Sequence, residues 1–109
     1  MRMVRRFEVA ERSMSPALEP GDYLVAVAGL PIRPGDLVVF EHPRRPGFLL
    51  VKRAVQVEDG RVTVLSDRPD LTLADSRTFG PVSQRGMYRV VFRYWPWRRF
   101  GPVRSATGW

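Results

Sequence analysis

The sequence predicts an all-β protein, a compact core of short antiparallel strands that forms a small barrel or packed sheets with little helix. Nine glycines and ten prolines interrupt the 109 residues at short intervals, which disfavours long helices. The runs between them are rich in β-branched and aromatic residues, the types enriched in strands. This length, with 44% apolar residues, suits a single domain that covers residues 1–109.

Each expected strand is an apolar or β-branched run that ends at a turn signal. The six expected strands lie near Met3–Val9, Tyr23–Ala28, Leu37–Glu41, Phe48–Val57, Arg61–Ser66 and Met87–Tyr94. Pro-Gly-Asp precedes the second and third of them, at Pro20–Asp22 and Pro34–Asp36, which indicates repeated turn chemistry. Glu58–Arg61 reads EDGR, a hairpin turn between two apolar runs.

Two segments have no strand pattern. Ser66–Pro81 is the one long stretch without clear periodicity, and long irregular segments in small domains are more often functional than idle. The last residues, 102–109, are expected to form a frayed tail, because chain ends with few apolar neighbours are seldom held in place.

Composition excludes several kinds of chemistry. The chain has no cysteine, so disulfides, thiolate zinc sites and cysteine nucleophiles are excluded. Its one histidine, His42, lies in a polar turn and is interpreted as a surface loop residue, so we expect neither a metal nor a cofactor. No run approaches the roughly 18 apolar residues of a membrane span, and the N-terminus lacks the apolar core of a signal peptide. We therefore expect a cytoplasmic protein without a membrane span.

The charges single out one lysine. The net charge is +7, and of the 18 basic side chains all are arginine except Lys52. Lysine, unlike arginine, loses its proton near neutral pH when it is desolvated. Lys52 alternates with apolar residues on one face of its strand, and Arg53 is the charge on the other, apolar face. Parity does not say which face is buried, but either arrangement places Lys52 inside an apolar strand, where its pKa falls.

Ser13 and Ser15 lie between the first expected strand and a proline-containing turn. Taken alone, each has the features of an ordinary loop serine. A neutral lysine can take a proton from a serine hydroxyl, as in the Ser-Lys variants of the catalytic triad. One of these serines together with Lys52 would therefore supply an activated nucleophile.

Four motifs, in order, resemble the S26 peptidase family, the type I signal peptidases and their relatives. The chain reads Ser-Met-Ser-Pro at 13–16 with a Gly-Asp turn after it, and a second Gly-Asp opens the strand at 34–40. A Lys-Arg box follows at 52–53, and Asp-Ser-Arg at 75–77 precedes Gly80. The resemblance runs from about residue 9 to about residue 101 and implies a signal-peptidase-like catalytic core.

By position, the resemblance implies that Ser13 is the nucleophile and that Lys52 is the general base that activates it. The backbone N–H of Ser13 would supply part of the oxyanion hole, where fixed donors stabilise the developing charge. The other implied site residues are Asp75 and Arg77, a pair that braces the site, and Met14 and Pro16, which support the substrate cleft.

Three positions depart from the family pattern. Glu11 stands where many members have a small or hydroxyl residue that helps to form the oxyanion hole, so we expect its side chain to point away from the oxyanion. Leu73 stands where bacterial signal peptidases have a serine that orients the lysine, and Thr72, one residue earlier, could take that role. Ser66 and Asp67 replace the usual Gly-Asp opening of this last box.

Within the family, the chain is similar to short members that mature nickel-type superoxide dismutases. We expect no membrane anchor. A large insertion is also absent between the Lys-Arg box and the last box, because only the 12 residues Ala54–Leu65 separate them. The likeness rests on ERSMSP at 11–16, EHPRRPG at 41–47 and RYWPWRRFG at 93–101. The implied substrate is the N-terminal propeptide of a nickel superoxide dismutase.

Three alternatives are weighed against this interpretation. The first is signal-peptidase-like processing of exported proteins at a membrane, since YWPWRRF at 94–100 suits contact with a bilayer surface. The second is a self-cleaving regulator that also uses serine and lysine, but only 12 residues precede Ser13. The third is a non-catalytic basic β-barrel that binds nucleic acid through its net charge of +7. The arginines are scattered along the chain, so no nucleic acid partner is expected.

Overall fold

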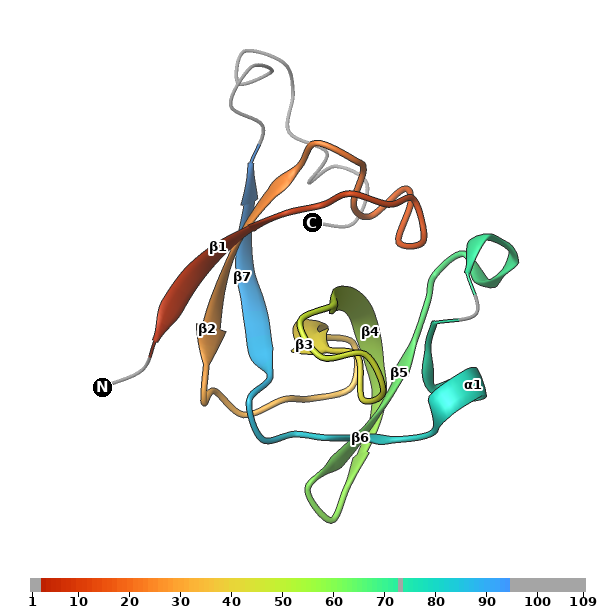
Figure 1. The fold of residues 1–109 in the computed structure, drawn as a ribbon. Helices are drawn as coiled ribbons and strands as arrows, with labels where there is room; N and C mark the ends of the chain where they lie inside the picture. The colour runs from red at the N-terminus through yellow and green to blue at the C-terminus, as the bar shows by residue number, and fades with distance from the viewer. Residues whose placement is uncertain (1–2, 73, 95–109) are drawn as a thin grey trace.

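The protein, seen in a computed structural model that describes residues 3–72 and 74–94, folds into one sheet of seven antiparallel strands (Figure 1). The strands are β1 (Val4–Glu8), β2 (Tyr23–Ala28), β3 (Leu37–Glu41), β4 (Leu49–Glu58), β5 (Arg61–Leu65), β6 (Val82–Ser83) and β7 (Tyr88–Tyr94). Their order in the sheet is β1-β2-β7-β3-β4-β5-β6. A 3-10 helix (Pro69–Leu71) and a single helical turn, α1 (Ser76–Phe79), lie between β5 and β6. The expected all-β class with little helix is confirmed.

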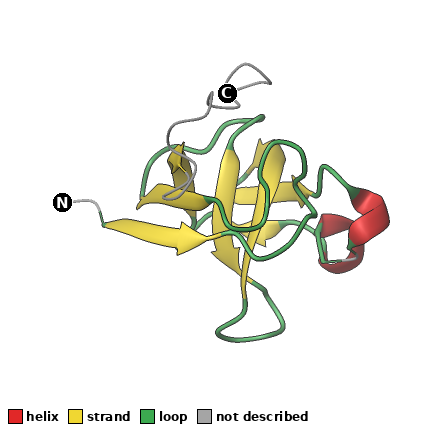
Figure 2. Cartoon of the chain, turned by 90° about the horizontal axis from the view of Figure 1, so that it is seen from above, coloured by secondary structure: helices red, strands yellow, loops and turns green. Residues whose placement is uncertain are grey.

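The sheet has two halves, β1, β2 and β7 on one side and β3 to β6 on the other (Figure 1, Figure 2). β7 joins them, because it pairs with β2 along its length and with β3 at Val38 and Val39. β3 is buried on both faces: Val38 and Phe40 pack in one apolar cluster, and Leu37 and Val39 pack in the other. The two halves are therefore held together by apolar contacts on both sides of β3.

The six expected strands are all present, and their ends lie within one residue of the expected ones. The sequence missed β6, because two residues, Val82 and Ser83, are too few to show an alternating pattern. The irregular segment 66–81 contains the two helical turns, and α1 begins where the Asp75 carboxylate accepts the backbone N–H of Arg77. Among the described residues, none of the helices is long and apolar enough to span a membrane. The expected tail at 102–109 lies outside the described residues.

The two Pro-Gly-Asp turns share one construction, as the sequence predicts. In each, the aspartate accepts the N–H of the residue three positions earlier, Asp22 from Glu19 at 2.9 Å and Asp36 from Arg33 at 2.8 Å. The glycine before each aspartate has a φ of 93° or 99°, in the left-handed region that favours glycine. The EDGR hairpin is also confirmed, since β4 and β5 join through two central residues with positive φ.

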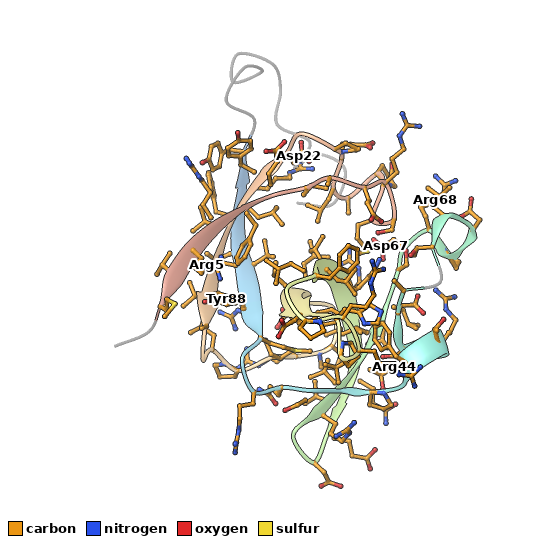
Figure 3. The ribbon with its side chains drawn as sticks, viewed as in Figure 1. Arg5, Asp22, Arg44, Asp67, Arg68 and Tyr88 are labelled. Atoms are coloured by element: carbon orange, nitrogen blue, oxygen red, sulfur yellow. The ribbon has the colours of Figure 1, made fainter. Side chains whose placement is uncertain are left out.

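Asp22 differs from Asp36 in being fully buried, and it anchors the loop between β1 and β2 (Figure 3). Arg93 of β7, which is also buried, donates to the carbonyl of Ala17 at 2.6 Å and lies 3.6 Å from the Asp22 carboxylate. Buried charges are unfavourable unless they are paired. The pair therefore fixes the loop that carries Ser13 against β7.

Replacing Asp22 by alanine should lower the free energy of unfolding by about 3–5 kcal/mol, because it removes the carboxylate that faces the buried Arg93. The matched variant Asp36→Ala removes the same turn hydrogen bond at a less buried position and should cost about 1 kcal/mol. Urea unfolding followed by circular dichroism measures both losses. Equal losses in the two variants would contradict the anchoring role of Asp22.

Candidate active site

Apolar contacts hold Ser13 in its loop. Met14 and Leu18, which follow it, are buried in one core cluster with Leu24 of β2. The N–H of Leu18 donates to the carbonyl of Met14 at 2.9 Å, which closes a turn directly after Ser13. Ser13 is itself only 4% exposed. The serine hydroxyl is thus placed on a rigid, desolvated segment and not on an open loop.

Lys52 lies on the buried face of β4, which settles the question that strand parity left open. Leu50, Lys52 and Ala54 point into the protein, whereas Leu49 and Val55, on the other face, are exposed. The Lys52 side chain is 1% exposed, and its Nζ donates to the Ser13 Oγ at 2.9 Å. Folding thus brings together the two residues that the resemblance pairs.

Burial lowers the pKa of the Lys52 ammonium below the ordinary lysine value, because desolvation penalises its charged form. The negative charges of Glu11 and Asp75 raise the pKa in part, and the positive charge of Arg77 lowers it further. A lysine with a lowered pKa can release its proton closer to neutral pH. Its neutral amine can then accept a proton from the serine hydroxyl within hydrogen-bond reach.

Ser66 is a site residue that the sequence did not single out beyond its departure from the Gly-Asp pattern. It is buried, and its hydroxyl donates a short hydrogen bond to the carbonyl of Ser13. Its own N–H donates to Asp75 Oδ2 at 2.9 Å. Neither strand periodicity nor the turn signals indicate this role, because the contact with Ser13 joins positions 53 residues apart.

Asp75 and Arg77 form an ion pair beside this contact. Asp75 is 1% exposed and accepts hydrogen bonds from the Arg77 guanidinium, the Arg77 N–H and the Ser66 N–H. Burial alone raises the pKa of the Asp75 carboxyl, but the hydrogen bonds from Arg77 and Ser66 outweigh it and hold the pKa below its usual range. A chain of contacts therefore runs from Arg77 through Asp75 and Ser66 to the backbone of Ser13.

The backbone of Ser13 is left with one free donor. Its carbonyl accepts both the Ser66 hydroxyl and the N–H of Arg68, the latter at 2.8 Å. Within residues 3–72 and 74–94, the Ser13 N–H has no hydrogen-bond partner. This N–H is available to a ligand, as an oxyanion-hole donor must be.

Asp67, the aspartate that follows Ser66 in the same box, connects the loop after β5 to the strand that carries the lysine (Figure 3). Its carboxylate forms a two-bond ion pair with Arg53, at 3.1 and 2.9 Å. Arg53 also donates to the carbonyl of Gly35 at 2.9 Å. Arg53, next to Lys52, thus connects the second Pro-Gly-Asp turn to the loop that carries Ser66.

The other expected site residues take different places. Met14 packs in the core behind the site, and Pro16 is exposed beyond it. The Thr72 hydroxyl accepts the N–H of Ala74 at 3.0 Å, and a role in orienting Lys52 stays a prediction; Leu73 lies outside the described residues. His42 lies in its turn as expected, half-buried, with its Nδ1 accepting the N–H of Arg44.

A groove of about 390 Å³ includes both Ser13 and Lys52 in its lining. It lies between the start of β4 and β1, whose residues and flanks line it together with single residues of β2 and β3. The lining residues are Arg6, Phe7, Glu8, Val9, Ala10, Glu11, Ser13, Leu24, Val39, Phe48, Leu49, Leu50, Val51 and Lys52. A largely apolar groove that ends at a serine and a lysine is suited to bind a peptide next to its scissile bond.

Among residues 3–72 and 74–94, no group of three or more His, Cys, Asp or Glu residues is placed to hold a metal ion. Near Ser13, the polar side chains in the lining of the groove are the serine hydroxyl, the Lys52 amine and the Glu11 carboxylate.

Comparison with known proteins places the chain in a family. The sequence profile described as signal peptidase, peptidase S26 matches residues 1–68, a segment that includes Ser13 and Lys52. The chain is 30% identical to the mitochondrial ATP-independent inner membrane protease subunit 1b of Arabidopsis thaliana, over 84% of this chain and 70% of that protein. It is 28% identical to the mitochondrial inner membrane protease subunit 1 of Xenopus tropicalis, over 69% of this chain and 57% of that protein. The chain belongs to the S26 family of peptidases, as its four motifs indicate.

Because Lys52 is the only lysine, protein labelled with ¹³C at lysine Cε gives one side-chain signal. Its titration midpoint should lie below the ordinary value of about 10.4. Between the lowered pKa of Lys52 in the folded protein and its ordinary pKa in the unfolded chain, the unfolded chain binds more protons. The free energy of unfolding should therefore rise with pH between these two pKa values. The Lys52→Met variant should lose this rise. A midpoint at or above the ordinary value would contradict the desolvation of Lys52.

Proposed function

We propose that the protein is a serine endopeptidase of the signal-peptidase type, in which Ser13 is the nucleophile and Lys52 the general base. The observation that carries the proposal is the buried contact of 2.9 Å between Lys52 Nζ and Ser13 Oγ at the end of a peptide-sized groove. Membership of the S26 family supports the same chemistry.

The geometry supports a two-stage reaction. Neutral Lys52 takes the proton from the Ser13 hydroxyl while its oxygen attacks the substrate carbonyl, and the free Ser13 N–H stabilises the resulting oxyanion. The protonated lysine then gives its proton to the departing amine, which leaves an acyl-enzyme ester on Ser13. Lys52 next takes a proton from water, whose oxygen attacks the ester carbonyl. The ester bond to Ser13 then breaks, Lys52 returns its proton to the Ser13 oxygen, and the new carboxyl end of the peptide is released.

The groove is suited to an extended peptide, because two strand edges face it. β1 pairs only with β2, so its other edge is free within the described chain. Residues 49–52 of β4 pair with β3, and pairing with β5 begins only at Arg53. A substrate strand can therefore add its backbone hydrogen bonds to these edges and place its side chains on the apolar lining.

The comparisons favour the membrane-linked alternative over the nickel superoxide dismutase propeptide as the substrate class. Both relatives are named as inner membrane protease subunits, whereas the narrower substrate rests on three short stretches, one of them mostly outside the described residues. We therefore infer that the protein processes the N-terminal segments of exported or membrane-inserted proteins.

The outer face of β1, β2 and β7 supports contact with a membrane surface. Val91 and Phe92 are about half exposed there, at 48% and 58%, and the Phe92 ring stacks on Tyr94. Arg6 covers the Tyr23 ring and donates to the Tyr94 hydroxyl. Apolar and aromatic side chains beside arginine complement an anionic bilayer surface, and Arg6 also lines the groove. This contact would place the groove beside the bilayer.

Ser13→Ala and Lys52→Arg should each reduce cleavage of a precursor peptide by about 10³-fold or more. The first variant lacks the nucleophile, and the second lacks a base, because arginine does not lose its proton near neutral pH. Ser15→Ala is the matched control, since Ser15 lies in the same loop but bonds to Glu19, and it should keep most of the activity. The wild-type kcat/KM should rise with pH as Lys52 loses its proton. Mass spectrometry of the products and circular dichroism of each variant measure cleavage and folding. Lys52→Met is a second test, which serves if arginine does not fit the buried site. Cleavage at the wild-type rate by a folded Lys52→Arg or Lys52→Met variant would refute the general-base role.

Phe92→Ser should weaken flotation with vesicles of phosphatidylcholine and phosphatidylserine by about threefold or more, because it removes apolar area from the outer face. Val55→Ser, which changes an exposed apolar residue of β4, is the control and should leave flotation unchanged. Equal flotation of Phe92→Ser and the wild type would exclude this face as the membrane contact.

A further inference from the structure

Glu11 is a carboxylate at the catalytic end of the groove, two residues before the nucleophile. Its side chain is exposed, it lines the groove together with Ser13 and Lys52, and its charge acts on Lys52. In the part of the chain that the structure describes, Glu11 forms no ion pair and its carboxylate accepts no hydrogen bond. An exposed carboxylate without an internal partner, in the lining of the same groove as Ser13, can pair with a group that the substrate brings.

The other charged residues of the groove are committed elsewhere. Arg6 contacts Tyr23 and Tyr94 on the outer face. Glu8 stands opposite Tyr23 in the β1–β2 register, so it belongs to the same outer face. Lys52 is buried and bonded to Ser13. Glu11 is therefore the charge that a peptide meets next to the scissile bond.

The negative charge of Glu11 is opposite in sign to the net charge of the molecule. A net charge of +7 attracts acidic peptides at long range and disfavours basic ones. A basic side chain next to the scissile bond would be attracted by Glu11 at short range, where the interaction is less screened than at long range. An acidic side chain at that place would be repelled by the Glu11 carboxylate.

We propose that Glu11 makes the groove selective for peptides that carry a lysine or arginine next to the scissile bond. The inference rests on the proposed peptidase function and names the substrate feature that this site reads. Glu11 acts here as a specificity residue for an electrostatic contact, without taking part in proton transfer.

The same contact connects substrate binding to the general base. Lys52 is faced by the charges of Glu11, Asp75 and Arg77, and of these Glu11 is the one that lies in the groove. A substrate cation on Glu11 offsets the negative charge that favours protonated Lys52. The correct substrate would therefore favour the neutral amine that the reaction needs.

The experiment uses the full chain and a set of peptides that differ only in one residue, Arg, Gln or Glu, at successive positions on either side of the scissile bond. At one or two of these positions the wild type should cleave the Arg peptide about tenfold faster than the Glu peptide, measured as kcat/KM. Glu11→Gln should remove the preference, and Glu11→Lys should reverse it. In Glu11→Gln the midpoint of the pH profile should move to lower pH, which a merely structural role would not produce.

Glu58→Lys is the control, because it makes the same change in charge at the β4–β5 hairpin, remote from the groove, and should keep the preference. Equal cleavage of the Arg and Glu peptides by the wild type would overturn the inference and leave the peptidase function intact. A preference that persists in Glu11→Gln would also overturn it. Cleavage that persists in Ser13→Ala would instead refute the proposed function.

Discussion

The contact between Lys52 Nζ and Ser13 Oγ is the interaction on which the rest of the site depends. It places an amine and a hydroxyl inside the protein at 2.9 Å, from segments 39 residues apart. Burial of the amine disfavours its charged form, so the surroundings that cost the fold stability also make the lysine a usable base. Under the proposed function, this balance between stability and reactivity accounts for a lysine at an apolar strand position that a methionine would fill at less cost in stability.

Two separate supports keep the serine in reach of the lysine. On one side, Arg93 and Asp22 hold the β1–β2 loop against β7. On the other, Asp75 holds Ser66, whose hydroxyl holds the carbonyl of Ser13. Both use buried, charge-assisted hydrogen bonds, which fix geometry more tightly than apolar contacts. The carbonyl of Ser13 is occupied and, within the described residues, its N–H is free, so the second support also orients the N–H that would bind the oxyanion in the proposed function.

The groove combines two kinds of recognition. The free edges of β1 and of the start of β4 can bind any extended backbone, whatever its sequence. Selectivity must therefore come from the side chains that line the groove, and most of these are apolar. Glu11 is the exception near Ser13, and it stands at the position where the family pattern has a small or hydroxyl residue. A departure from that pattern at the catalytic end is where a difference in substrate choice can arise.

The sequence by itself determined every strand except the two-residue β6, together with the Pro-Gly-Asp turns and the EDGR hairpin, because each depends on alternation or hydrogen bonds within a few residues. It also pointed to Ser13 and Lys52, through ordered motifs and a single lysine. Only the tertiary structure decided which face of β4 is buried, since both faces are apolar in sequence. Only the tertiary structure, likewise, shows that the Ser66 hydroxyl bonds to the carbonyl of Ser13, which lies 53 residues away in the sequence. Such contacts depend on how distant strands pack together, and local sequence carries no record of that packing.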